Sequence, residues 1–143
     1  MSTPNELKLE NQICHSIYSA TNALIRAYRP LLEELDLTYP QYLVMMALWE
    51  EDRVMIKRLS ERTRLDAGTL TPILKRLEDK GLVIRQKSSE DSRQKLLYVS
   101  EKGMHLRDKA TEVPAALLCQ VQMTREEATL LKQLSEKLYK QLT

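Results

Sequence analysis

One stretch of eighteen residues decides the fold class of this chain. It reads Asp66-Ala67-Gly68-Thr69-Leu70-Thr71-Pro72-Ile73-Leu74-Lys75-Arg76-Leu77-Glu78-Asp79-Lys80-Gly81-Leu82-Val83. Its apolar side chains recur every three or four residues, which predicts an amphipathic helix. Four of them are expected to face the core: Leu70, Ile73, Leu74 and Leu77. The face left over is polar first and basic later: Thr69, Thr71, Pro72, Lys75 and Arg76. Asp66 or Thr69 can cap the start, and Gly81, preceded by cationic Lys80, ends the helix.

The segments on either side of this helix complete a recognisable order. A short amphipathic helix with a basic outer face is expected over residues 56 to 62, and strand-like segments over 83 to 87 and 95 to 99. The polar stretch 88 to 94 contains no glycine, which predicts a longer hairpin loop rather than a tight turn. Helix, turn, helix and basic hairpin is the order of a winged helix-turn-helix. That shape suits duplex DNA, because a helix fits the major groove and a hairpin reaches the minor groove.

The rest of the chain reads as helices, and the expected fold class is mainly α with a small two-stranded β wing. Apolar spacing predicts a helix from Glu6 to Tyr28 that Pro30 interrupts. A Thr38-x-x-Gln41 capping box opens a helix over 42 to 51, apolar on most sides. Ser100 begins a helical section that Pro114 kinks or interrupts and that continues over 115 to 123. A second capping box at Thr124 opens a last helix with leucines on one side.

Charge is unevenly distributed along the chain. Residues 53 to 95 hold twelve Lys and Arg against six Asp and Glu, a net charge of +6, whereas the remainder carries −4. A polyanion is therefore attracted to the middle of the chain and mildly repelled by its ends. A basic run by itself is equally well explained as a solvated face. The order of elements and the basic hairpin favour DNA binding.

Composition excludes several other classes. With 143 residues and 43% hydrophobic content the chain suits one folded domain. No apolar run reaches the length of a membrane span, and the first residues lack the pattern of a secretion signal, so a cytoplasmic location is expected. Cys14 and Cys119 lie far apart, and His15 and His105 form no ligand cluster with them. Neither a disulfide framework, a metal site nor a cofactor is expected.

The motifs quoted above resemble those of the MarR family of repressors. The run 66 to 83 is similar to that family's recognition helix, and Glu90 to Arg93 followed by Val99 to Gly103 is similar to its wing and next helix. The resemblance covers almost the whole chain and implies one MarR-like domain. Residues 37 to 100 would form the winged helix-turn-helix, and residues 1 to 36 and 101 to 143 the dimerisation helices. A homodimer would place its two recognition helices on a pseudo-palindromic operator.

The resemblance also implies particular DNA contacts in the wing. Arg93 would enter the minor groove, held by Asp91 two residues earlier. An extended guanidinium in a narrow electronegative groove benefits from a fixed carboxylate. Arg85 and Lys87 of the basic hairpin join the helix residues Thr69, Thr71, Pro72, Lys75 and Arg76 as expected DNA-binding residues.

Cys14 and the tyrosines after it suggest how such a repressor is controlled. Cys14 and Tyr18 lie four residues apart on one helix face. A cysteine on an apolar helix face is usually inert packing. However, the segments Leu9 to Cys14, Tyr28 to Leu32 and Leu37 to Leu43 resemble the organic-hydroperoxide-sensing (OhrR-like) branch of the family. The resemblance implies that Cys14 is the sensor, with Tyr28 and Tyr39 of the partner subunit hydrogen-bonded to it and Tyr18 nearby.

Cys119 extends this hypothesis to a second cysteine. One sub-branch of these sensors resolves the oxidised cysteine through a second cysteine in the C-terminal helices, and Cys119 lies in a compatible region. The alternative is an inert Cys119, with oxidation ending as a mixed disulfide between Cys14 and a small thiol.

Three rival functions remain open at this point. The dimer can be a MarR-type repressor that a small aromatic acid releases from DNA. It can be a thiol peroxidase, although no Arg, Thr or Pro cluster surrounds Cys14 as turnover requires. It can also be a winged helix used only for protein contacts, which gives no reason for a basic hairpin. The sequence favours a repressor over an enzyme.

Overall fold

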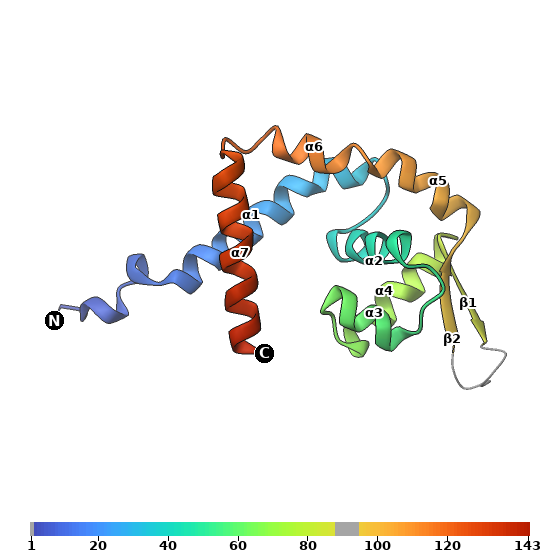
Figure 1. Cartoon of the computed structure of the whole chain (residues 1–143), viewed down its shortest axis with the longest axis horizontal. Coiled ribbons are helices and arrows are strands. Elements are labelled where there is room, and N and C mark those ends of the chain that lie inside the picture. Colours follow the sequence, from blue (N-terminus) through green and yellow to red (C-terminus); the bar gives the residue numbers. More distant parts are fainter. Residues whose placement is uncertain (1, 88–94) are drawn as a thin grey trace. The chain divides into compact units, whose positions relative to one another are not determined.

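Helices dominate the fold, as the sequence predicts. The computed structural model describes residues 2–87 and 95–143, which form two compact units, Met1–Val113 and Pro114–Thr143. The first unit begins with two 3₁₀ turns, η1 (Asn5–Leu7) and η2 (Leu9–Asn11). The α-helices α1 (Ile13–Glu33), α2 (Tyr39–Glu50), α3 (Ile56–Thr63) and α4 (Ala67–Asp79) follow (Figure 1). Strands β1 (Val83–Lys87) and β2 (Lys95–Val99) then lead to α5 (Glu101–Ala110).

Helix α2 is the centre of the first unit. It contacts α1, α3, α4, α5 and β2, and three of its side chains, Val44, Met45 and Leu48, are completely buried. Helix α4 faces this core with Leu70, Leu74 and Leu77, also fully buried, while Ile73 is partly buried against it. The 3.6-residue spacing of α4 therefore fixes which of its faces stays in solvent. The predicted core face of α4 is confirmed.

Helix caps fix where α2 and α4 begin and end. The Thr38–Gln41 capping box is present: the Gln41 amide donates to Thr38 Oγ1 at 3.3 Å, and the Thr38 amide donates to Gln41 Oε1 at 3.2 Å. Of the two candidates for the α4 cap the structure has Asp66, whose carboxylate accepts the Thr69 amide at 2.7 Å. After α4, Gly81 adopts a φ of +74°. The Gly81 and Leu82 amides bond to the carbonyls of Glu78 and Leu77, which closes the helix in a Schellman motif.

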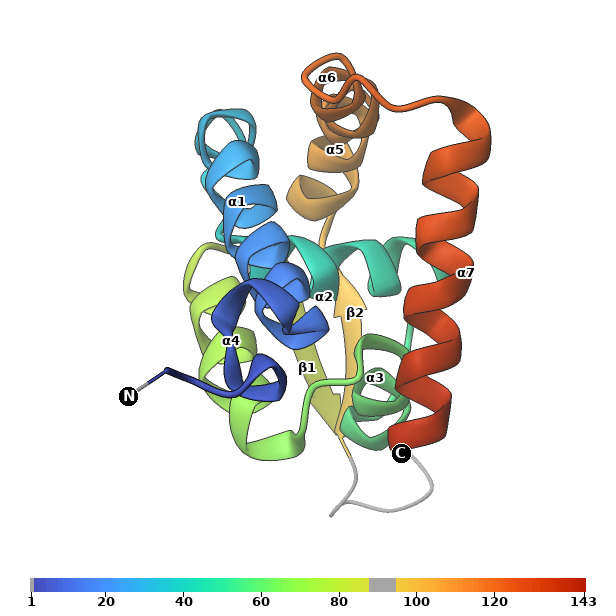
Figure 2. The same cartoon turned by 90° about the vertical axis from the view of Figure 1, so that its left-hand side faces the viewer.

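The two strands form the predicted antiparallel wing. Val83 pairs with Val99 and Lys87 with Lys95 at its two ends. Val54, just before α3, adds an isolated bridge to Leu97, which is fully buried and anchors the hairpin to the helices. Figure 2 shows β1 and β2 side by side, with β2 leading directly into α5. The expected loop between them, with Asp91 and Arg93, lies outside the described residues.

The start and the end of α1 differ from the sequence expectation. Residues 5 to 11 form 3₁₀ turns instead of the start of α1, because the Asn11 side chain donates to the Asn5 carbonyl and that of Gln12 to the Glu6 and Lys8 carbonyls. The predicted interruption at Pro30 is wrong, since α1 continues to Glu33. Proline removes one hydrogen bond near the end of the helix, and burial of Leu32, 1% exposed, outweighs that loss.

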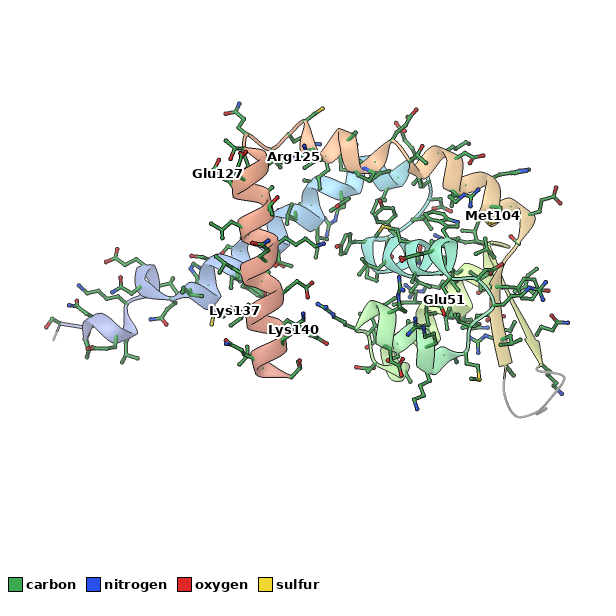
Figure 3. The ribbon with its side chains drawn as sticks, viewed as in Figure 1. Glu51, Met104, Arg125, Glu127, Lys137 and Lys140 are labelled. Atoms are coloured by element: carbon green, nitrogen blue, oxygen red, sulfur yellow. The ribbon has the colours of Figure 1, made fainter. Side chains whose placement is uncertain are left out.

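The second unit contains the end of α6 (Val113–Leu118) and all of α7 (Arg125–Leu142). The predicted continuation to residue 123 is wrong, because amides 120 and 121 bond three residues back and Thr124 is already extended as the next cap. The Thr124–Glu127 capping box is confirmed. In Figure 3, Arg125 and Glu127 lie at one end of α7, and Lys137 and Lys140 lie toward the other. No helix in the described residues is both long and apolar enough to cross a membrane.

Candidate functional site

The solvent face of α4 is the first candidate site. All five of its predicted contact residues, Thr69, Thr71, Pro72, Lys75 and Arg76, are exposed. The buried leucines on the opposite face hold this orientation. Neither Lys75 nor Arg76 forms an ion pair within the described part of the chain. Their donors therefore remain available to an anion, whereas the Thr71 hydroxyl already donates to the Ala67 carbonyl at 2.8 Å.

Much of the positive charge of residues 53 to 95 is neutralised inside the unit. Arg58 pairs with Glu51 at 2.9 Å, and its hydrogen bonds hold the Glu51 pKa below the usual range. Arg62 pairs with Glu50, and Arg53 stacks over the Tyr98 ring at 5.1 Å. A smaller set of exposed cations has no such partner among the described residues: Lys57, Lys75, Arg76, Lys87 and Lys95. These cations, and not the total charge, form the surface available to a polyanion.

The wing divides its basic residues between two roles. Arg85 is paired with Glu78 of α4 and is only 21% exposed, so it joins the wing to the helix. Lys87 and Lys95 are exposed and directly opposite each other in the register. Like charges in that position repel unless an anion lies between or beside them. The sequence interpretation did not include Lys95 in the site, and pairing the two strands from their ends would have found it.

A cluster of three tyrosines is the second candidate site. The Tyr28 ring lies 5.0 Å from that of Tyr39 and 5.9 Å from that of Tyr42, and the last two rings are 6.5 Å apart. Burial raises the pKa of each phenol above 10, so all three remain protonated at neutral pH. Within the described residues none of the three hydroxyls forms a hydrogen bond. The cluster therefore presents unused donors.

The predicted redox site also includes Tyr18 and the two cysteines. Cys14 and Cys119 are both free and exposed, and they belong to different units. Tyr18 is 68% exposed and makes no ring contact with another described tyrosine. The structure brings together Tyr28 and Tyr39 of the predicted thiol network, and it adds Tyr42. The spacing of Tyr39 and Tyr42, three residues apart on one helix, was the signal for the third ring.

No group of three or more His, Cys, Asp or Glu among the described residues could hold a metal ion. The candidate chemistry is thus that of anion contacts on α4 and the wing, and of a thiol with phenol donors.

Comparison with known proteins identifies relatives over most of the chain. Residues 26–110 match the family "Transcriptional regulator SarA/Rot". The organic hydroperoxide resistance transcriptional regulator of Bacillus subtilis is 42% identical over 135 residues, which cover 94% of this chain and 90% of that protein. The structure of reduced AbfR bound to DNA superposes with a TM-score of 0.82 at 31% identity, covering 96% of this chain and 94% of AbfR. The PcaV regulator of Streptomyces coelicolor gives a TM-score of 0.88 at 21% identity and supports the fold alone.

Fold and surface together define the class as a winged helix-turn-helix transcriptional regulator. The matched family covers more than half of the residues, and the Bacillus relative extends the match to nearly all of them. The chain belongs to the MarR/SarA family of transcriptional regulators. The family resemblance that the sequence predicts is confirmed, including the likeness to an organic hydroperoxide resistance regulator.

Proposed function

We propose that this protein is a dimeric repressor that leaves its operator when an organic hydroperoxide oxidises Cys14. One observation carries the proposal: a cluster of three tyrosines, Tyr42 buried and Tyr28 and Tyr39 half-buried, has unused hydroxyl donors on α1 and α2. The chain is also similar to a hydroperoxide resistance regulator. Phenol donors stabilise a thiolate, the nucleophilic form of cysteine. In the dimer, Cys14 would accept hydrogen bonds from Tyr28 and Tyr39 of the partner subunit, as the resemblance implies, with Tyr18 nearby.

The sensing reaction has two steps. The Cys14 thiolate attacks one peroxide oxygen, the S–O bond forms as the O–O bond breaks, and the alkoxide leaves as an alcohol after taking a proton. The sulfenic acid that results is reversible and condenses with a thiol. The Cys119 thiol of the other subunit would then displace water and form a disulfide. Losing the thiolate removes the acceptor of the tyrosine hydrogen bonds, which would shift the dimer from its DNA-competent form.

DNA would be bound by α4 and the wing. Thr69, Thr71 and Pro72 would enter the major groove, with Lys75 and Arg76 at bases or phosphates. Lys87 and Lys95 would contact phosphates, and Arg93 with Asp91 would reach the minor groove, while Arg85 positions the wing through Glu78. We assign residues 37–100 to the DNA-binding winged helix-turn-helix, within a single MarR-like domain. The regulator would bind its double-stranded operator in the cytoplasm.

The dimer would form through the terminal helices, residues 1–36 and 101–143. The apolar side chains that this chain leaves exposed are concentrated there: Leu7 and Ile13 at 72%, Leu130 and Leu131 at 55%, and Leu134 at 54%. Burial of such side chains against a second copy removes apolar surface from water.

The decisive experiment compares Cys14→Ser with the unaltered protein. Operator binding is measured before and after stoichiometric cumene hydroperoxide, and Cys14 is followed by mass spectrometry. The variant should bind DNA and not release it, whereas the unaltered protein should release it as it gains one oxygen or a disulfide. Normal release by Cys14→Ser would refute the sensing role. Loss of the oxidised dimer band in Cys119→Ser on non-reducing gels would support resolution, and its persistence would refute it.

A cavity beside Tyr39 favours a second candidate, a repressor released by a small aromatic acid. About 390 Å³ in volume, it is lined by the apolar residues Ile25, Leu32, Leu37 and Pro40 and by the charged residues Arg29 and Glu33. The apolar residues would hold an aromatic ring and the Arg29 guanidinium its carboxylate, while Glu33 offsets the positive charge of the lining. Release by benzoate together with insensitivity to hydroperoxide would select this function. A hydroperoxide-consumption assay with dithiothreitol separates both from a thiol peroxidase, because a repressor should show no turnover.

A further inference from the structure

A second cavity of the first unit, of about 210 Å³, lies where three parts of the winged helix-turn-helix meet. The turn between α1 and α2 contributes Asp36, the end of α4 contributes Lys80, and α5 contributes Lys102, His105 and Lys109. The three α5 residues fall at positions i, i+3 and i+7, so they share one helix face. Lys80 follows Thr69 by eleven residues, which places the cavity roughly 16 Å from the DNA-reading end of α4.

Two of its lysines are already held in place. The Lys80 ammonium donates to the Asp36 carbonyl and, at 2.9 Å, to Gln41 Oε1. The Lys102 ammonium donates to the Lys80 carbonyl at 2.8 Å. Each ammonium has three donors, so both retain at least one for another acceptor. Ordering these side chains in advance lowers the entropy lost when a ligand binds.

The other two nitrogen groups are uncommitted. His105 and Lys109 are exposed, and neither has a hydrogen bond or ion pair with another residue in the described ranges. The Asp36 carboxylate lies 3.8 Å from Lys80 and is 89% exposed. Three lysines against one carboxylate give the lining a net charge of +2 with His105 neutral. A dianion is the ligand that neutralises such a lining.

We propose that this cavity binds the phosphate group of a small phosphorylated metabolite. Lysine ammonium groups bind phosphate as point charges, and three of them against one carboxylate favour a doubly charged phosphate group over a singly charged carboxylate. The buried side chains of Leu35 and Leu82, 6% and 4% exposed, supply an apolar wall for the carbon skeleton. The ligand would contact both α5 and the end of α4, the helix proposed to enter the major groove. Its binding could therefore change the affinity of the protein for its operator.

The experiment uses the chain's two histidines as reporters. The reduced full-length protein, in low-salt buffer without DNA or oxidant, is titrated with inorganic phosphate, phenyl phosphate and succinate while ¹H NMR follows the His105 and His15 ring protons, assigned with His15→Gln. The His105 resonance should move saturably and His15 should not. Phenyl phosphate should bind more tightly than inorganic phosphate, because of the leucine wall. Since neither DNA nor Cys14 takes part, failure here is distinguishable from failure of the proposed repressor function.

Lys109→Gln and Lys57→Gln form a matched pair of variants. Both remove one exposed, unpaired lysine from the first unit, on α5 and α3 respectively, so neither should affect folding. Lys109→Gln should weaken phenyl phosphate binding about ten-fold, the cost of one charge-assisted hydrogen bond, and Lys57→Gln should leave it unchanged. Equal weakening in both variants, parallel shifts of both histidines, equal affinity for the two phosphates, or tighter binding of succinate would overturn the proposal.

Discussion

Gly103 determines how closely α5 can approach the wing. A Cβ atom at this position would lie 2.5 Å from the Leu82 carbonyl oxygen and 2.6 Å from a Val99 methyl carbon. The same residue's carbonyl accepts the Trp49 indole N–H at 3.0 Å. Gly103 therefore joins α5 to the wing on one side and to α2 on the other.

Replacing this glycine should strain the packing of α5. Gly103→Ala is expected to lower the free energy of unfolding by about 1–3 kcal/mol, as overpacking does in other cores, because the Leu82 backbone cannot move aside cheaply. Urea denaturation measures it. Gly68→Ala is the control, since its Cβ would meet only the Asp66 carboxylate oxygen, at 3.3 Å. Equal losses in the two variants would refute the close-approach explanation.

At the scale of elements, α4 depends on its cap. Hydrogen bonds from Thr69, the backbone amide first and the side chain second, hold the Asp66 pKa below its usual range. A carboxyl group with a lowered folded-state pKa stabilises the fold above its unfolded pKa, near 3.9, and this contribution is lost as pH falls through the folded value.

Asp66→Ala should therefore destabilise the protein at pH 7 and have progressively less effect as pH falls below about 4, because the unfolded carboxyl is protonated first and the native carboxyl follows at lower pH. Urea unfolding of both proteins at pH 7, 5 and 3 tests this. Asp66→Asn, which still caps without a charge, should lie between them at pH 7. A destabilisation that stays constant over this range would contradict the electrostatic part of the cap.

The solvent face of α4 has its own prediction. Lys75→Ala with Arg76→Ala should weaken operator binding by about 1–3 kcal/mol and reduce its salt dependence, because two cations are lost from the reading surface. Fluorescence anisotropy with labelled operator DNA at several salt concentrations measures both effects. Lys109→Ala, in the same unit on α5, serves as the control and should leave the salt dependence unchanged. An unaltered salt dependence in the double variant would place the DNA elsewhere.

Local sequence patterns predicted the helices and strands better than the contacts between them. Caps at Thr38 and Thr124, the stop at Gly81 and both strands depend on neighbouring residues, and the structure has them as expected. Continuation of α1 past Pro30 depends on the burial of Leu32 by residues distant in the sequence. The spacing of apolar residues along the chain gives no information about such contacts. The pairing of Arg85 with Glu78 and the third tyrosine of the cluster likewise require two elements to be placed together.

At the scale of the whole molecule, α7 carries a surface that one copy does not bury. Leu134→Glu should convert the dimer to a monomer in sedimentation experiments, because it would place a charge in the interface that we propose for the terminal helices. Gln133→Glu adds the same charge about 100° around the helix and should remain dimeric. A dimeric Leu134→Glu would move the interface away from this face of α7.

The facing lysines at the end of the wing have a consequence for how salt acts on the protein. Without DNA, the ammonium groups of Lys87 and Lys95 repel each other, and dissolved ions screen this repulsion. Moderate salt should therefore slightly raise the melting temperature of the free protein. In the proposed operator complex the same ions would compete with these lysines for the phosphates and weaken binding. This one pair of side chains would thus give salt opposite effects on the free protein and on the operator complex, and operator binding would stabilise the wing.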